Sequence, residues 1–381
     1  MAFVLTVNAE KFRHHSASLV REFNHVAARL VPVVKGNGYG FGRTVLAHEV
    51  TRLGLGQLAV GTVWELEQAL SDFAGDIQVL EPFNSHDAVA LREWKRVLKH
   101  HSSRIIATVA SNQLVDATHA GVERVLVEGA TSMHRFGMST YELSAALDQV
   151  GSTVAVVGLS LHLPIADPTI SHVAMLESTP ASPSQKVAGR VLETIGWLVW
   201  YRELAQQHSL PLHVSLSHFS VDELKQLRNH VSASDVTIDM RVGTQLWLGA
   251  PDSLCVTGTV LAVHEVGYGH TLVGYGQVDS HGHKRLIVVS GGTSHGVALA
   301  APVNTRTLRK RAIAISEGIS QALGKVRSPF IWKKENLVFA EPPHMHVSML
   351  WCQDSAIKVG DELTCTIRNT TASFDQVIGL E

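Results

Sequence analysis

Two patterns of apolar residues alternate along the first two thirds of the chain. Short runs rich in Val, Ile and Leu, with no polar alternation, are separated by stretches in which apolar residues recur at helical spacing. Such runs are typical of parallel strands that are buried on both faces. After a short strand at 3–7, we expect a strand that ends at Lys35 and further strands at 57–62, 76–81, 104–110, 124–128, 155–162, 212–217 and 236–241.

Helical spacing is clearest at residues 10–29 and 186–208, and a short helix opens at 222. About eight strands separated by helical stretches favour a closed (β/α)8 TIM barrel. A doubly wound open sheet also fits the alternation, but the number of strands favours closure.

Beyond residue 248 the pattern changes to short Val, Thr and Leu runs that are separated by glycine. We expect strands at 256–266, 271–273, 285–290, 337–340, 362–368 and 376–380, and an excursion at 302–330 that is helical at 309–323. The prediction is therefore a barrel over residues 1–248, followed by a C-terminal antiparallel β domain over residues 249–381.

The composition of the chain argues against several classes of function. The 381 residues carry 32 Lys and Arg against 34 Asp and Glu, a balance that favours neither nucleic acid nor an anionic membrane as partner. No apolar run reaches the roughly 18 residues of a membrane span, and the N-terminus has no basic leader. The three cysteines fit free thiols in a reducing compartment, so we expect a cytoplasmic protein without bound metal.

Lys35 is the strongest candidate for chemistry. It ends an apolar strand and precedes a turn dense in glycine, 36–42, at the strand edge where α/β barrels hold their active sites. A lysine beside apolar strand is suited to a lowered pKa and to imine formation. The alternative is a strand-end lysine that extends its charge into solvent.

The segment 33–40, Val-Val-Lys-Gly-Asn-Gly-Tyr-Gly, resembles the motif of the alanine racemase family of fold type III pyridoxal-phosphate enzymes. The resemblance implies that Lys35 links covalently to pyridoxal 5'-phosphate and that Tyr39 reaches the phosphate. The segment 240–244 resembles a second family motif, which implies Arg241 against the pyridine nitrogen and phosphate binding by Gly243 and Thr244. A fixed cation at that nitrogen opposes its protonation.

Further segments match the family in the same order. By resemblance, Arg135 binds the substrate carboxylate, and Glu128 stands where many relatives have a carbamylated lysine that holds this arginine. A solvated strand-end glutamate is the alternative for Glu128. His162 resembles a histidine that contacts the catalytic tyrosine, and Ser217 resembles a phosphate ligand, with Ser220 as the alternative.

Racemisation needs acid and base groups on both faces of Cα. Lys35 serves one face, and the segment 271–276 resembles the family motif whose tyrosine, here Tyr275, reaches the other face from the partner subunit. A homodimer with composite active sites is implied. Met349 is the substrate-binding residue that the resemblance assigns in the second domain.

The second domain also departs from the family. Residues 289–296 lack the gate tyrosine, residues 345–350 lack the Asp of a Met-Asp pair, and the usual C-terminal tyrosine that binds phosphate is missing. The chain is thus expected to be a divergent member. The implied function is a racemase that interconverts L- and D-alanine, with D-alanine supplied to the bacterial cell wall.

Two alternatives remain open. A metal-assisted D-threonine aldolase or D-serine dehydratase would use pairs such as His281 and His283 or His344 and His346, but no carboxylate or cysteine cluster accompanies them. A non-catalytic pyridoxal-phosphate carrier would need Lys35 but no second base. A glycine pattern at 54–59 precedes a strand instead of following one, so it predicts no dinucleotide site.

Overall fold

The computed structural model describes residues 2–150, 153–168, 187–232, 234–266, 271–280, 282–299, 318 and 326–381. Its contacts divide the chain into two compact units. The barrel unit contains Arg13–Gly38 and Arg43–Gly249, and the β unit contains Met1–Phe12, Tyr39–Gly42 and Ala250–Glu381. The predicted boundary near 248 lies beside this division, but the first twelve residues group with the β unit.

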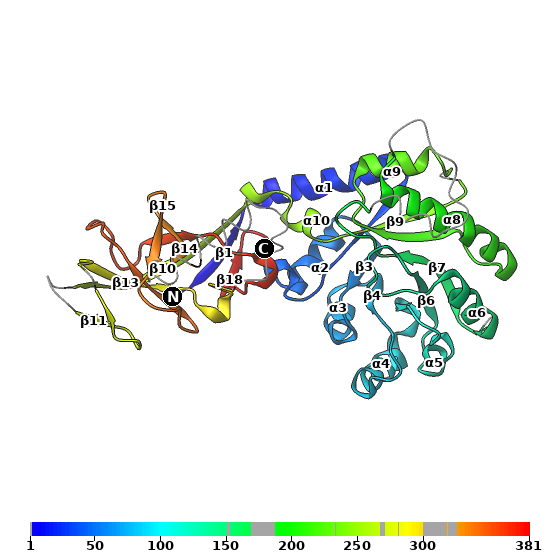
Figure 1. Cartoon of the computed structure of the whole chain (residues 1–381), viewed down its shortest axis with the longest axis horizontal. Coiled ribbons are helices and arrows are strands. Elements are labelled where there is room, and N and C mark those ends of the chain that lie inside the picture. Colours follow the sequence, from blue (N-terminus) through cyan, green and yellow to red (C-terminus); the bar gives the residue numbers. More distant parts are fainter. Residues whose placement is uncertain are drawn as a thin grey trace. The chain divides into compact units, whose positions relative to one another are not determined.

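The barrel unit is built on eight parallel strands (Figure 1). They are β2 (Ala28–Pro32), β3 (Gln57–Val60), β4 (Asp76–Pro82), β5 (Ile105–Val109), β6 (Arg124–Gly129), β7 (Ala155–Leu161), β8 (His213–Ser217) and β9 (Thr237–Val242). The hydrogen-bonded order runs β2-β9-β8-β7-β6-β5-β4-β3. A parallel bridge between Val33 and Ala59 joins the two ends, so the predicted TIM barrel is confirmed.

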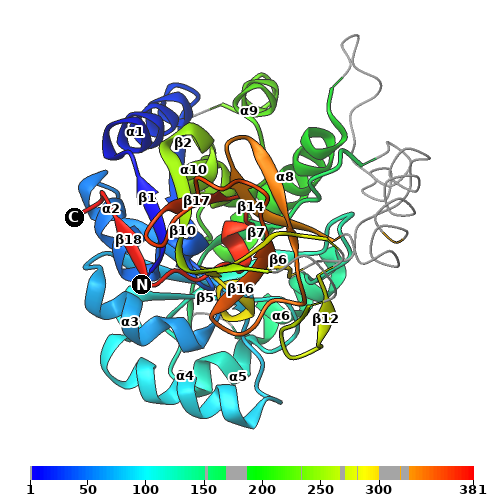
Figure 2. The same cartoon turned by 90° about the vertical axis from the view of Figure 1, so that its left-hand side faces the viewer.

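Helices cover the outside of the barrel, and Figure 2 shows α2, α3, α4 and α5 as a continuous blue-to-cyan layer. The helices are α1 (Ala9–His25), α2 (Arg43–Arg52), α3 (Leu66–Asp72), α4 (Ala88–His101), α5 (Leu114–His119), α6 (Thr140–Val150), α8 (Gly189–His208), α9 (Val221–Arg228) and α10 (Thr244–Leu248). The Asp87 side chain caps α4 by accepting the N–H groups of Val89 and Ala90. None of the described helices is long and apolar enough to cross a membrane.

The inside of the barrel is unusually polar. Near the N-terminal ends of the strands, Asp239 accepts hydrogen bonds from Arg29 at 2.6 Å and from His213 at 2.9 Å. Halfway up, both polar atoms of the Gln78 amide and the Ser215 hydroxyl are buried with no hydrogen-bond partner among the described residues. Buried polar groups are normally paired, so these atoms are exceptions within the described part of the barrel.

The β unit is a mostly antiparallel sheet. Its strands are β1 (Phe3–Val7), β10 (Leu254–Glu265), β13 (Arg285–Ser290), β14 (Arg327–Trp332), β15 (Glu335–Phe339), β16 (Val347–Trp351), β17 (Glu362–Cys365) and β18 (Gln376–Ile378). The order β13-β16-β15-β14-β17-β10-β1-β18 curls round because β13 also pairs with β10. The described part confirms the predicted antiparallel domain, with one parallel pairing between β1 and β18.

Two strands of this sheet, β14 and β16, were not predicted. Pro329 lies within β14, and proline inside an apolar run argues against a strand in a sequence pattern. The predicted helix at 309–323 lies outside the described residues, apart from the single position 318. A separate hairpin of β11 (Leu272–Val273) and β12 (Val278–Asp279) stands beside the main sheet.

Candidate active site

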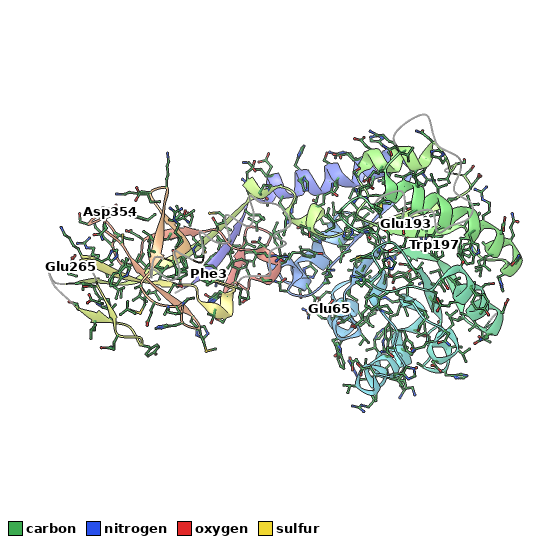
Figure 3. All side chains as sticks on the ribbon, viewed as in Figure 1. Phe3, Glu65, Glu193, Trp197, Glu265 and Asp354 are labelled. Carbon is green, nitrogen blue, oxygen red and sulfur yellow. The ribbon has the colours of Figure 1, made fainter. Side chains whose placement is uncertain are left out.

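Lys35 lies just past β2 on a turn that glycine makes possible. Gly36 and Gly38 have φ of 61° and 62°, and a Cβ on Gly38 would approach the backbone nitrogen of Arg43 to 2.7 Å. Glu65 (labelled in Figure 3) holds this turn against the end of β3. Its buried carboxylate accepts the Gly36 N–H at 2.8 Å and the Gly61 N–H at 2.7 Å.

The surroundings of Lys35 favour its neutral amine. Burial has the largest effect and lowers the pKa of this lysine. The positive charges of Arg135 and Arg241 also lower this pKa, whereas the negative charge of Glu65 raises it. A neutral amine is the form that attacks a carbonyl carbon. The lowered pKa agrees with the direction that the sequence analysis expected for Lys35.

Arg241 comes from β9 and is buried inside the barrel mouth. Its guanidinium donates to Ser160 Oγ at 2.8 Å and to the Leu161 carbonyl at 2.8 Å. Burial lowers its pKa to about 10, against the opposing charge of Glu128. Arg241 thus stays a cation at neutral pH and is fixed in one orientation.

Glu128 is only 2% exposed, which excludes the alternative of a solvated strand-end carboxylate. Burial raises the pKa of Glu128, while the charges of Arg241 and then Arg135 lower it. The described structure contains no hydrogen bond between Glu128 and Arg135. Glu128 therefore interacts with the two arginines through its charge.

Other groups hold the loop that carries Arg135. Glu193, from α8, accepts the Ser132 N–H at 2.5 Å and the Ser132 hydroxyl at 2.7 Å. The Thr131 hydroxyl donates to the His162 carbonyl at 2.6 Å. Arg135 itself is exposed, with its guanidinium 5.0 Å from the centre of the Phe136 ring. A free guanidinium beside the barrel mouth is suited to two-point binding of a carboxylate.

His162 and Ser217 lie together. Their side chains are 3.3 Å apart (Ser217 Oγ to His162 Nδ1), and Ser217 Oγ also accepts the Leu163 N–H at 3.2 Å. Burial, aided by Arg241 and Arg135, lowers the pKa of His162 to about 2, so its ring is neutral. The alternative phosphate ligand, Ser220, is used as the N-cap of α9, where it accepts the Glu223 N–H.

Gly243 and Thr244 begin α10. Their backbone N–H groups form no hydrogen bond with any described residue, as is usual for the first turn of a helix. Arg135 and Arg241 both lower the pKa of Lys35, and Arg135 also lowers the pKa of Arg241. The barrel mouth therefore favours an anion such as a phosphate or a carboxylate.

The remaining predicted residues belong to the β unit. Tyr39 is buried and has φ of 54°, and Met349 packs against a hydrophobic cluster that includes Leu286 and Trp351. Tyr275 lies at the tip of the β11–β12 hairpin and is 88% exposed. An exposed tyrosine at a hairpin tip is available to another molecule.

Three residues of the site were missed in the sequence. Glu65 and Glu193 position the Lys35 and Arg135 loops, and His218 packs edge-on against His162 with ring centres 5.1 Å apart. His218 directly follows Ser217 at the end of β8, so its place at the strand edge was the signal that could have found it. Neither Glu65 nor Glu193 is part of a sequence motif, so no signal in the sequence marks them.

Comparison with known proteins identifies a family model and a set of solved structures. The family described as "Alanine racemase, N-terminal domain" matches residues 7–186. The match covers a little under half of the chain, within the barrel part of the sequence. No curated protein matches the sequence.

Solved structures of alanine racemases share the fold of this chain. The alanine racemase of Bacillus anthracis with bound L-Ala-P is 15% identical with a TM-score of 0.65, covering 95% of this chain and 84% of that one. The alanine racemase of Streptomyces lavendulae is 17% identical with a TM-score of 0.62, covering 96% and 87%. That of Bartonella henselae with covalently bound pyridoxal phosphate is 17% identical with a TM-score of 0.60, covering 96% and 90%.

Proposed function

We propose that the protein is a pyridoxal-phosphate-dependent amino acid racemase that interconverts L- and D-alanine in the cytoplasm and so supplies D-alanine to the cell wall. The observation that carries the proposal is Lys35, an amine of lowered pKa that faces Arg135 and Arg241 at the mouth of an alanine racemase N-terminal domain.

The donor groups fit the cofactor. Lys35 would link to its aldehyde, and the unengaged N–H groups of Gly243 and Thr244 would hold its phosphate with help from Ser217 and Tyr39. Arg241, held by Ser160 and Leu161, would lie against the pyridine nitrogen. When bound, pyridoxal phosphate withdraws electrons from Cα of the amino acid and so acidifies its hydrogen.

The chain supplies the remaining functions. Arg135 binds the substrate carboxylate, and Met349 contributes to the substrate pocket. Lys35 removes or returns the Cα proton on one face, while the partner subunit's Tyr275 does so on the other. Neutral His162 is available as a hydrogen-bonding partner for that tyrosine. These roles require a homodimer with composite sites.

The test combines cofactor binding with turnover. Titration with pyridoxal phosphate should give the visible absorption of a lysine-linked cofactor, and a panel of L- and D-amino acids should identify alanine as the substrate that is racemised. The Lys35→Ala variant should lose both signals. Lys95→Ala, at an exposed position on α4, should keep both.

The other outcomes discriminate the alternatives. Cofactor binding without inversion of any amino acid would replace the racemase by a carrier protein. Activity that depends on added divalent metal would favour the lyase. Against the lyase, no group of three or more metal-binding side chains occurs among the residues that the structure describes.

A further inference from the structure

Tyr275 lies on the β11–β12 hairpin, which is very short. Each strand has two residues, and the connecting loop 274–277 carries the tyrosine. A hairpin of this size has no independent stability in water. Val273 packs against the cluster of Val266, Leu286, Ala340 and Trp351, which fixes the base of the hairpin. The tip must be held by something else.

Glu341, which follows β15, holds the tip. Its buried carboxylate accepts the N–H of Tyr275 at 3.2 Å and the N–H of Gly276 at 3.1 Å. Gly274 has φ of 73°, and a Cβ there would lie 2.3 Å from the Glu341 carboxyl group, so only glycine lets the loop close on this carboxylate. Loop and carboxylate are therefore complementary in shape.

His344 extends this contact to the phenol ring. Its Nε2 hydrogen-bonds to Glu341 Oε1 at 2.7 Å, and its ring stacks on the Tyr275 ring with centres 4.6 Å apart and planes inclined by 29°. Burial opposes ionisation of Glu341, but the hydrogen bonds from Gly276, His344 and Tyr275 outweigh it and lower the pKa of Glu341. One carboxylate thus fixes both the backbone of Tyr275 and the ring that stacks on its side chain.

We propose that Glu341 and His344 are positioning residues that hold the Tyr275 phenol in the single orientation it needs to act as an acid and base. The proposal rests on the racemase function. An exposed tyrosine otherwise samples several rotamers, and each turnover then loses the entropy of selecting one of them. None of the family motifs in this sequence includes Glu341 or His344.

A kinetic experiment separates positioning from general structure. Racemisation of alanine by the holoenzyme is followed in deuterium oxide, with inversion and α-hydrogen exchange with retention measured together. In His344→Ala, inversion should fall by up to about 100-fold, because a displaced acid or base is inefficient. Exchange with retention on the Lys35 face should remain. The inversion-to-exchange ratio should therefore fall, with little change in KM.

Two further variants serve as a rescue and as a control for His344→Ala. His344→Phe keeps an aromatic ring against Tyr275 and should recover much of the inversion that alanine loses. The matched control is His283→Ala, which removes another stacked histidine of the β unit, 4.8 Å from the Trp351 ring, and should leave the ratio unchanged. An equal loss of inversion and exchange in His344→Ala would show a general structural role and overturn the proposal.

A second readout does not depend on activity. With 3-fluorotyrosine in place of the five tyrosines, the fluorine resonance of Tyr275 is assigned from its loss in Tyr275→Phe. That resonance should shift in His344→Ala and stay in place in His283→Ala, because stacking alters the shielding of the ring. An unshifted resonance overturns the positioning contact. A shifted resonance in a protein without racemisation leaves the contact in place and overturns the proposed function.

Discussion

The two units bury different kinds of interior. The barrel unit encloses charged side chains such as Arg241, Asp239 and Glu128, each at most 6% exposed. The core of the β unit beside β1 is aromatic, with Phe3 stacked on Phe374 at 5.6 Å and edge-on to Phe330 at 6.3 Å. The barrel thus holds Arg241 and Asp239 by hydrogen bonds and Glu128 among opposite charges, whereas the β unit beside β1 is stabilised by aromatic packing.

This difference separates the chemistry from its support. Buried charges in the barrel shift the pKa values of Lys35 and His162 and create a site that favours an anion. The β unit contributes the proposed second acid and base, Tyr275, on a hairpin that Glu341 and His344 hold. We therefore expect the stability of the barrel to depend on pH and that of the β unit to depend on packing.

The largest effect is expected from Phe3→Ala in the β unit. Phe3 is fully buried and contacts three rings, so its removal leaves a cavity that costs about 3–5 kcal/mol of unfolding free energy. Urea unfolding should show the same loss at acid and at neutral pH. The control is Val359→Ala at an exposed position, which should change little. A loss below about 1 kcal/mol would contradict the contrast between the units.

Asp239→Asn should have the next largest effect, and it should depend on pH. Burial raises the pKa of Asp239, but the hydrogen bonds from His213 and Arg29 outweigh burial and lower it. Because the pKa is lower in the folded state, the contribution of Asp239 is present at neutral pH and is lost as the pH falls through that value. The variant should lose about 1–3 kcal/mol at neutral pH and little in acid.

Glu128→Gln is the matched comparison, because burial raises the pKa of Glu128. Ionisation of Glu128 then opposes folding above its ordinary pKa of about 4.3, so the amide should leave stability at neutral pH unchanged or higher. Urea unfolding over a pH series measures both variants. Equal destabilisation by Asp239→Asn and Glu128→Gln would show that hydrogen bonding, and not charge, sets the stability of the barrel.

Much of the fold could be predicted from the sequence because the barrel strands are apolar throughout. Each predicted strand of the barrel appears within a few residues of its expected bounds, and Lys35 lies at the carboxyl edge as expected. The β unit was harder because its strands are short and β14 contains Pro329. The pairing of β1 with β10 and β18 joins segments from both ends of the chain, and no local pattern encodes such a pairing.

The sequence predicted only those residues of the candidate site that are part of a sequence motif. Lys35, Arg135 and Arg241 are recognisable from adjacent residues. Glu193 is not, because the Ser132 groups that it binds are 61 positions away in the sequence. The sequence also does not show that Glu128 is buried in the barrel, where the charge of Arg241 lowers the pKa of its carboxyl group more than that of Arg135 does. Contacts of this kind, between segments that are distant in the sequence, can be identified only in a structure.

Only a small loss of stability is expected from Glu65→Gln, which tests how this distant residue acts on Lys35. The amide oxygen can accept only one of the two N–H groups well, at a cost of about 1 kcal/mol. The Glu65 charge raises the pKa of Lys35, so its removal should lower that pKa and move covalent attachment of pyridoxal phosphate to lower pH. Borohydride trapping and mass spectrometry across a pH series measure this shift, and Glu67→Gln, on the exposed face of α3, is the control. A shift to higher pH would mean that Glu65 acts on Lys35 through the turn at Gly36 and not through its charge.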